Sequence, residues 1–119
     1  MAILMTITLH GIPNCDTVKK ARTWLDGQNV AYAFRDYKKA PPSHEELQAW
    51  VAQTGWEPLL NKAGTTFRKL PDADKTGLDE AKAIALMVAN PSMIKRPVVT
   101  GATALLVGFK PDQWSSALG

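Results

Sequence analysis

A strand–turn–helix–strand pattern in residues 4–37 constrains the fold of this chain more than any other feature. The segment LMTITLH, 4–10, alternates apolar and polar positions and predicts a strand. After a turn at 11–13, a helix is expected over 16–26, because its apolar positions recur at helical spacing and a glycine follows. The segment VAYAFRDY, 30–37, predicts a second strand. Two strands joined through a helix are typical of a parallel βαβ unit.

Residues 41–94 carry no strand pattern, and we expect them to form a helical insert. Ser43, with Glu46 three residues on, is a capping box that predicts the start of a helix. Residues 57–70 have no clean period and predict short helical turns and loop. Another helix is expected over 79–89. Its buried face is expected to contain Ala81, Ile84, Ala85 and Val88.

The last 24 residues predict a hairpin followed by a helix. RPVVT at 96–100 and ALLVG at 104–108 are short apolar segments around a glycine, a spacing that suits a β-hairpin. Pro111 is well placed as the first residue of a final helix. We therefore expect 1–119 to form one α/β domain with a mixed four-stranded sheet, in the order βαβ, helical insert, ββα.

Composition excludes several classes of protein and site. A single cysteine rules out an internal disulfide and fits a reducing compartment. With only two histidines, no zinc or other metal site is expected. The formal charge of +3 comes from scattered basic residues, so no nucleic acid partner is expected. No segment approaches the roughly 20 apolar residues of a membrane span. A cytoplasmic protein without a membrane partner is expected.

The single cysteine, Cys15, follows a strand and a proline turn at the expected start of a helix. Asn14 or Asp16 could cap that helix. Unpaired N–H groups and the helix dipole favour an anion there, and the thiolate is the reactive form of cysteine. Lys19, one turn further on, adds a positive charge. From these residues alone two interpretations stay open: a nucleophile, or an inert buried thiol, which is the common state of a free cysteine.

Four segments together resemble the arsenate reductase (ArsC) family. They are GIPNCDTVKKARTWL at 11–25, GTTFRKL at 64–70, IKRPVV at 94–99 and VGFKP at 107–111. Their order and spacing resemble those of the glutathione-linked branch of the family, which includes the Spx and YffB relatives. The resemblance is greatest to the YffB-type subgroup. The likeness covers nearly the whole chain in the same order. It implies a thioredoxin-like fold with a helical insert at about 41–94.

The resemblance also implies roles for individual residues. Cys15 matches the catalytic cysteine of the family. Arg96 matches an arginine of the arsenate site, and Pro97 matches a cis-proline whose backbone can pair with the cysteinyl part of glutathione. The residues expected to bind substrate or glutathione are Asn14, Thr17, Lys19, Arg68, Arg96, Pro97 and Lys110.

The chain departs from the arsenate reductase pattern at several of these positions. An arginine used in arsenate reduction falls at Asn61, and another falls at Lys110. The histidine that aids thiolate formation falls at Gly11, with His10 displaced by one. Val18 stands where Spx has a second cysteine. Because lysine lacks the bidentate geometry of arginine, we expect arsenate to be a poor substrate.

The function implied by the resemblance is a glutathione-dependent thiol oxidoreductase. The Cys15 thiolate would attack, and external glutathione would resolve the adduct, because the chain has no second cysteine. Glutathione is expected as co-substrate and glutaredoxin as a further partner of a monomer, with no bound cofactor. Three alternatives stay open: a regulator like Spx that binds RNA polymerase without a redox switch, a true arsenate reductase, and a fold relic without catalysis.

Overall fold

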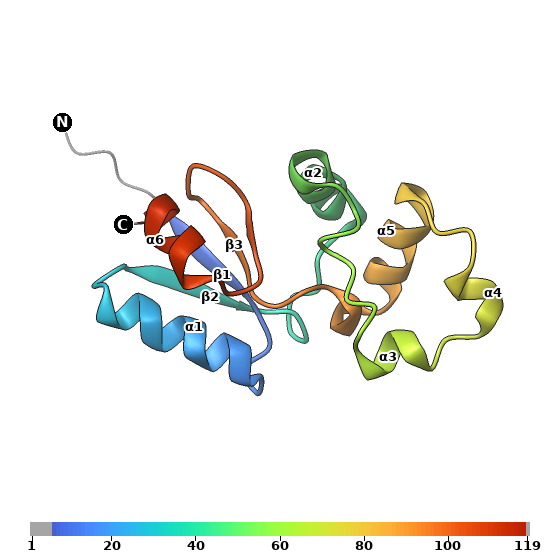
Figure 1. Ribbon diagram of the computed structural model, residues 1–119, viewed down its shortest axis with the longest axis horizontal. Helices are drawn as coiled ribbons and strands as arrows, with labels where there is room; N and C mark the ends of the chain where they lie inside the picture. Colours follow the sequence, from blue (N-terminus) through green and yellow to red (C-terminus); the bar gives the residue numbers. More distant parts are fainter. Residues whose placement is uncertain (1–5, 119) are drawn as a thin grey trace. The chain divides into compact units, whose positions relative to one another are not determined.

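A computed structural model describes residues 6–118 of the chain, which divide into two compact units (Figure 1). One unit, here called the sheet unit, contains the N-terminal part of the chain through Tyr37 and the C-terminal part from Arg96. The other, the helical unit, is Lys38–Lys95. Each unit is described by itself below.

The sheet unit is built on a mixed four-stranded sheet, as predicted. Its strands are β1 (Ile7–Gly11), β2 (Tyr32–Asp36), β3 (Val98–Thr100) and β4 (Leu106–Val107). They lie in the order β2-β1-β3-β4, in which β1 and β2 are parallel and the other two pairs are antiparallel. The expected βαβ unit and hairpin are therefore confirmed. Residues 4 and 5 of the first expected strand lie outside the described residues.

Two helices, α1 (Asp16–Gly27) and α6 (Pro111–Leu118), pack on one face of this sheet. Apolar side chains of both helices share one core with residues of β1, β3 and β4. Its buried members are Ile7, Leu9, Val18, Ala21, Leu25, Val99, Leu106 and Trp114. Trp114 is fully buried, and its indole N–H donates a hydrogen bond to the Gly108 carbonyl at 3.0 Å. Burial of each large apolar side chain contributes about 1.5–3 kcal/mol, so this core holds α1 and α6 to the sheet.

Two glycines allow close approaches that a larger residue would prevent. An added Cβ at Gly11 would lie 2.8 Å from Cγ2 of Val18, so this glycine lets β1 approach α1. Gly101, between β3 and β4, has φ of +93°, and an added Cβ there would lie 1.7 Å from the carbonyl oxygen of Thr6. The hairpin therefore passes over the backbone next to β1 at a point where only glycine fits.

The helical unit contains short helices and no extended sheet among its described residues. Its elements are α2 (His44–Thr54), α3 (Thr65–Arg68), α4 (Asp72–Lys75), α5 (Glu80–Ala89) and the 3₁₀ turn η1 (Pro91–Met93). The predicted capping box is present, since the Ser43 hydroxyl accepts a hydrogen bond from the Glu46 N–H at 3.1 Å. Leu47, Trp50 and Val51 of α2 are buried.

The predicted buried face of α5 was wrong in part: Ile84 is buried and Val88 is half-buried, as predicted, but the two alanines are not. Ala83, Ile84 and Met87 are buried, whereas Ala81 and Ala85 are exposed. The segment is apolar on nearly all sides, so its spacing predicts a helix but does not fix which side packs inward. Packing against neighbouring elements decides the face.

An isolated antiparallel bridge in the helical unit had no sequence signal. Leu60 pairs with Ile94, and the neighbouring hydrogen bonds join Asn61 N–H to the Met93 carbonyl at 2.7 Å and Lys95 N–H to the Leu59 carbonyl at 2.8 Å. The bridge ties the loop before α3 to the segment that leaves η1. A single bridged pair of residues is too short to produce the alternation of apolar and polar residues that predicts a strand.

Each helix in the described part of the chain is too short, or too polar, to cross a lipid bilayer.

Candidate functional site

Cys15 is the N-cap residue of α1. Its backbone is extended, with φ of −142° and ψ of 123°, and its carbonyl accepts the Lys19 N–H at 2.9 Å. The sequence suggested Asn14 or Asp16 as the capping residue. Neither caps the helix, because the helix begins at Asp16 and the residue directly before it is Cys15. The Cys15 side chain makes no capping hydrogen bond, and it is half-buried against the core shared by α1 and the sheet.

The first turn of α1 leaves backbone donors without partners. The N–H groups of Asp16, Thr17 and Val18 donate to no acceptor among residues 6–118. Such N–H groups, with the positive end of the helix dipole, favour an anion beside the cap residue. The Asp16 carboxylate in the same turn is negatively charged and opposes the binding of an anion there. The position of Cys15 is therefore suited to a thiolate or to an anionic ligand.

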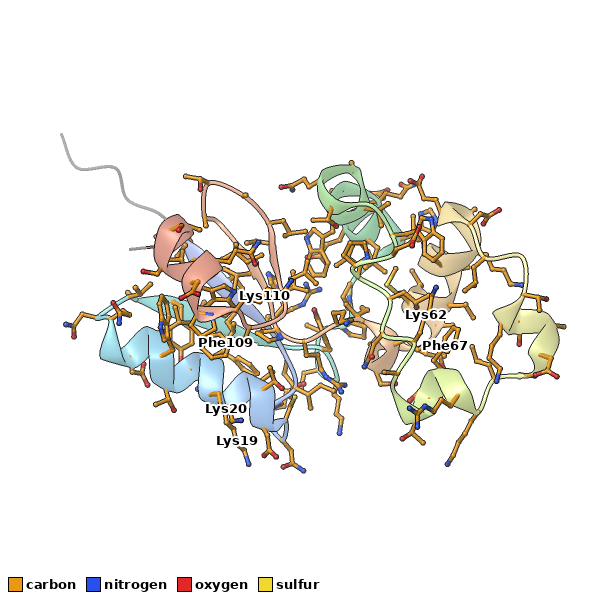
Figure 2. The ribbon with its side chains drawn as sticks, in the orientation of Figure 1. Lys19, Lys20, Lys62, Phe67, Phe109 and Lys110 are labelled. Atoms are coloured by element: carbon orange, nitrogen blue, oxygen red, sulfur yellow. The ribbon has the colours of Figure 1, made fainter. Side chains whose placement is uncertain are left out.

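The register of the sheet brings three segments to one end. His10 of β1 pairs with Val98 of β3, and Val98 pairs with Val107 of β4. The chain leaves β1 toward Cys15 at this end, enters β3 through 96–97 and leaves β4 through 108–110. Figure 2 shows Phe109 and Lys110 where the chain passes from β4 to α6, and Lys19 and Lys20 on the first half of α1.

Arg96 and Pro97 lie at this end of the sheet. The peptide bond between them is cis, as the resemblance predicted. Pro97 is buried, and its carbonyl accepts the Gly108 N–H at 2.8 Å. Arg96 is half-buried, and neither its guanidinium nor its backbone N–H and carbonyl has a hydrogen-bond partner in the described part of the chain. Its charge and its peptide groups remain available to a ligand.

Four other predicted residues lie in the same unit and are exposed. They are Asn14, Thr17, Lys19 and Lys110. Within residues 6–118 their side chains form no hydrogen bond and no ion pair. The sheet unit therefore places three cations, Lys19, Arg96 and Lys110, on the segments that meet at or start from this end. Their roles in binding stay predictions.

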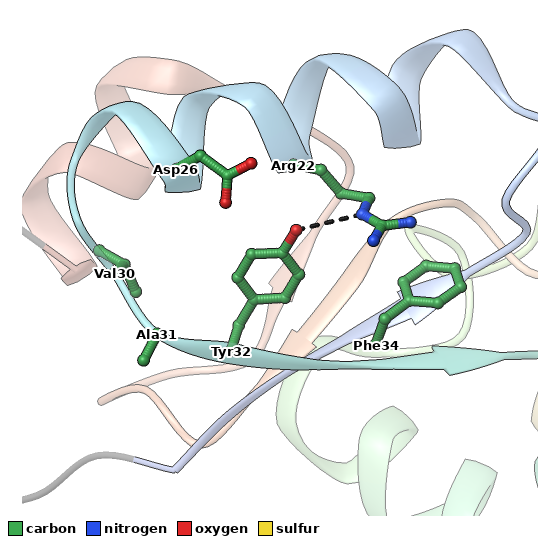
Figure 3. Close-up of a pocket in the computed structure, with 6 residues that line it drawn as sticks. All are labelled: Arg22, Asp26, Val30, Ala31, Tyr32 and Phe34. Carbon is green, nitrogen blue, oxygen red and sulfur yellow. Dashed lines mark hydrogen bonds between the residues drawn. The ribbon is translucent and has the colours of Figure 1, made fainter.

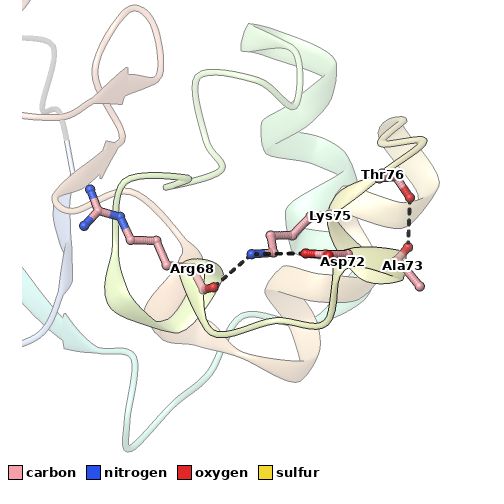
Figure 4. A network of polar contacts seen from close by, with 5 residues as sticks. All are labelled: Arg68, Asp72, Ala73, Lys75 and Thr76. Carbon is pink, nitrogen blue, oxygen red and sulfur yellow. Dashed lines mark hydrogen bonds and ion pairs between the residues drawn. The ribbon is translucent and has the colours of Figure 1, made fainter.

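Arg68 lies in the helical unit, at the end of α3 (Figure 4). Its backbone carbonyl accepts a hydrogen bond from Nζ of Lys75 at 2.9 Å, and that Nζ lies 4.0 Å from Oδ1 of Asp72. The Arg68 guanidinium points away from this network and has no partner of its own among the described residues. Asn61 is in the same unit and half-buried. A role for Arg68 at the cysteine stays a prediction.

His10 faces away from α1. Arg35 donates to its Nδ1 at 3.2 Å, so its Nε2 carries the hydrogen that is donated to the Thr100 hydroxyl at 2.8 Å. Leu9 points into the α1 core, and successive side chains of a strand alternate between faces. At position 11, where the resemblance implied a histidine in arsenate reductases, a side chain would collide with Val18. The structure therefore offers no histidine on the α1 side of β1 at positions 10 and 11.

The described residues contain no group of three His, Cys, Asp or Glu side chains that could hold a metal ion.

The strand order, with α1 and α6 on one face, defines a thioredoxin-like α/β protein, and its single cysteine lies at the start of α1. The ArsC family model matches residues 10–117, and the chain belongs to the ArsC family. The predicted family is thus confirmed.

Three known proteins show how this chain relates to the family. The solved structure of the YffB protein is 59% identical, with a TM-score of 0.92, over 96% of this chain and 100% of that chain. An arsenate reductase (ArsC) related protein from Brucella melitensis is 48% identical, with a TM-score of 0.77, over 98% and 97%. The global transcriptional regulator Spx of Streptococcus mutans is 30% identical over 109 residues, which are 90% of this chain and 79% of the regulator.

Proposed function

We propose that this protein is a glutathione-dependent thiol oxidoreductase of the cytoplasm, with Cys15 as its nucleophile. The observation that carries the proposal is the position of Cys15 as the N-cap of α1, beside N–H groups that have no acceptor among the described residues. Such groups stabilise a thiolate in the resting protein and the thiolate that leaves during exchange. Membership of the ArsC family supports the same chemistry.

The proposed reaction has two thiol–disulfide exchanges. The Cys15 thiolate attacks the glutathione sulfur of a mixed disulfide, a bond forms between Cys15 and glutathione, and the other sulfur leaves as a thiolate and takes a proton from water. A second glutathione, as its thiolate, then attacks the adduct and leaves as oxidised glutathione, and Cys15 returns to its thiolate form. External glutathione is required because Cys15 is the only cysteine of the chain.

The glutathione would lie along the Arg96–Pro97 segment. The N–H and carbonyl of Arg96, unpaired among residues 6–118, can bond an extended peptide as a neighbouring strand would. The Arg96 guanidinium is half-buried, so it can bind a carboxylate with less screening than an exposed cation. Lys19 and Lys110 add positive charge for the second carboxylate.

Mass spectrometry tests this proposal. The folded protein is incubated with oxidised glutathione alone and then with reduced glutathione. We expect one glutathione on Cys15 after the first step and its removal after the second. A Cys15→Ser variant is the control for other sites of addition. If the folded protein forms no adduct while the urea-unfolded protein does, Cys15 is an inert thiol and the proposal is wrong.

A second candidate function is a transcriptional regulator, favoured by the 30% identity to Spx of Streptococcus mutans. A two-cysteine switch would need a thiol at position 18, where this chain has a fully buried valine. A regulator of this sequence would therefore bind RNA polymerase without a redox signal. Capture of RNA polymerase by tagged wild type and by Cys15→Ser, equally under reducing and oxidising conditions, would support it. Absence of capture together with turnover at Cys15 would leave the oxidoreductase alone.

A further inference from the structure

A polar pocket lies between α1 and β2, here called the α1–β2 pocket (Figure 3). Its volume is about 450 Å³, within the range of small-molecule sites. The lining residues are Arg22, Asp26, Val30, Ala31, Tyr32 and Phe34. β2 is an edge strand of the sheet, so the pocket opens at the sheet's outer margin.

Arg22 is held in one orientation in this pocket. Its Nε donates a hydrogen bond to the Tyr32 hydroxyl at 3.1 Å, and its Cζ lies 4.7 Å from the centre of the Phe34 ring. A guanidinium fixed by a hydrogen bond and a ring face loses little freedom when it binds a carboxylate. Its two terminal amino groups make no hydrogen bond within residues 6–118. The forked end of Arg22 is therefore oriented and available.

Asp26 contributes the opposite charge to the same pocket. It lies four residues after Arg22 on α1, a spacing at which arginine and aspartate commonly pair. Here Arg22 is committed to Tyr32 and Phe34, and among the described residues the Asp26 carboxylate has neither an ion pair nor a hydrogen bond. The pocket thus presents a cation and an anion that do not neutralise each other.

Tyr32 adds a donor between these charges. Its oxygen accepts from Arg22, so its own O–H remains to donate. We propose that the α1–β2 pocket binds a small zwitterion of the free α-amino acid class. The carboxylate accepts hydrogen bonds from the Arg22 amino groups and the Tyr32 hydroxyl, the ammonium group donates to Asp26, and an aliphatic side chain contacts Val30 and Ala31.

This pocket is separate from the cysteine site. Arg22 is seven residues beyond Cys15 on α1, a rise of about 10 Å, and Asp26 is one turn further away. Amino acid binding therefore does not depend on the proposed exchange chemistry. Loss of Cys15 should leave the pocket unchanged.

A titration followed by ¹H–¹⁵N NMR tests the proposal with three probes that share one side chain. L-leucine carries both charges, N-acetyl-L-leucine lacks the ammonium group, and 3-methylbutylamine lacks the carboxylate. We expect L-leucine to cause saturable shifts at the amides of the lining residues. Each single-charge probe should bind about tenfold more weakly or worse, since a charged hydrogen bond is lost.

Variants assign the binding to the two charges. Arg22→Met and Asp26→Asn should each weaken L-leucine about tenfold or more, and Tyr32→Phe should weaken it less. Lys20→Met, an exposed cation of the same helix, and Cys15→Ser should bind as wild type does. The dispersion of each spectrum reports whether the variant is folded. Shifts that do not saturate, or equal affinities for the three probes, would overturn the proposal.

Discussion

The Pro97 carbonyl accepts a hydrogen bond from the Gly108 N–H at 2.8 Å, and this bond joins the entry to β3 with the exit from β4. Arg96 precedes Pro97 and Lys110 follows Gly108 by two residues, so the bond places both cations at the end of the sheet toward which β1 runs. Arg96 itself contributes no backbone hydrogen bond among residues 6–118. The segment is thus anchored at the proline and open at the arginine.

The first prediction follows from this arrangement. Arg96→Gln should weaken glutathione binding by about 1.5–3 kcal/mol, the contribution of a hydrogen bond to a charged group. The free energy of unfolding should change little, because the guanidinium has no partner in the described part of the chain. Isothermal titration with reduced glutathione measures the first quantity, and urea unfolding measures the second. Lys95→Gln is the matched control, since Lys95 is an exposed cation that directly precedes Arg96 in the sequence. Equal affinity of Arg96→Gln and wild type would exclude Arg96 from the site.

The second prediction concerns the thiol. Cys15→Ser should abolish adduct formation and turnover and change the free energy of unfolding by less than about 1 kcal/mol, since the side chain is half-buried and makes no capping bond. Alkylation by iodoacetamide in native and unfolded protein provides an independent measurement. We expect the folded protein to react at least as fast as the unfolded chain. Protection of the folded protein would indicate a structural thiol.

The sequence predicted the sheet unit well because its signals are local. Alternation in β1, the helical spacing of Val18, Ala21 and Leu25, and Pro111 at the first position of α6 each depend on neighbouring residues. The parallel pairing of β1 with β2 follows from the helix that joins them.

The helical unit was predicted less well because its features depend on distant residues. The buried side of α5 is set by packing with α2 and η1, and the Leu60–Ile94 bridge joins residues 34 positions apart. At the cysteine, the sequence predicted a helix start but not that Cys15 is itself the cap, because Asn14 and Asp16 are both better capping residues. The α1–β2 pocket had no sequence signal, since it arises from side-chain contacts between α1 and β2.

The third prediction is that arsenate is a poor substrate. The family resemblance implies arginines at the positions of Asn61 and Lys110, and loss of two such contacts should cost about 3 kcal/mol or more in transition-state stabilisation. Arsenate reduction with glutathione and glutaredoxin, measured beside turnover of a glutathione mixed disulfide, checks this expectation. The double variant Asn61→Arg with Lys110→Arg should raise arsenate turnover and leave mixed-disulfide turnover nearly unchanged. Rapid arsenate reduction by the wild type would instead indicate that Arg68 and Lys110 replace the arginines.

The last prediction concerns the turn between β3 and β4. Gly101→Ala should destabilise the protein by more than 3 kcal/mol, roughly the upper range for a strained backbone position, because steric overlap adds to the strain. The added Cβ would lie 1.7 Å from the Thr6 carbonyl oxygen, and φ is +93°. Gly77→Ala is the matched control: its φ is +62°, but nothing lies within 4 Å of an added Cβ. That variant should lose only about 1–2 kcal/mol, the cost of a left-handed conformation without a collision. Urea unfolding of both variants separates the two contributions, and equal losses would show that the close approach to Thr6 is relieved without cost.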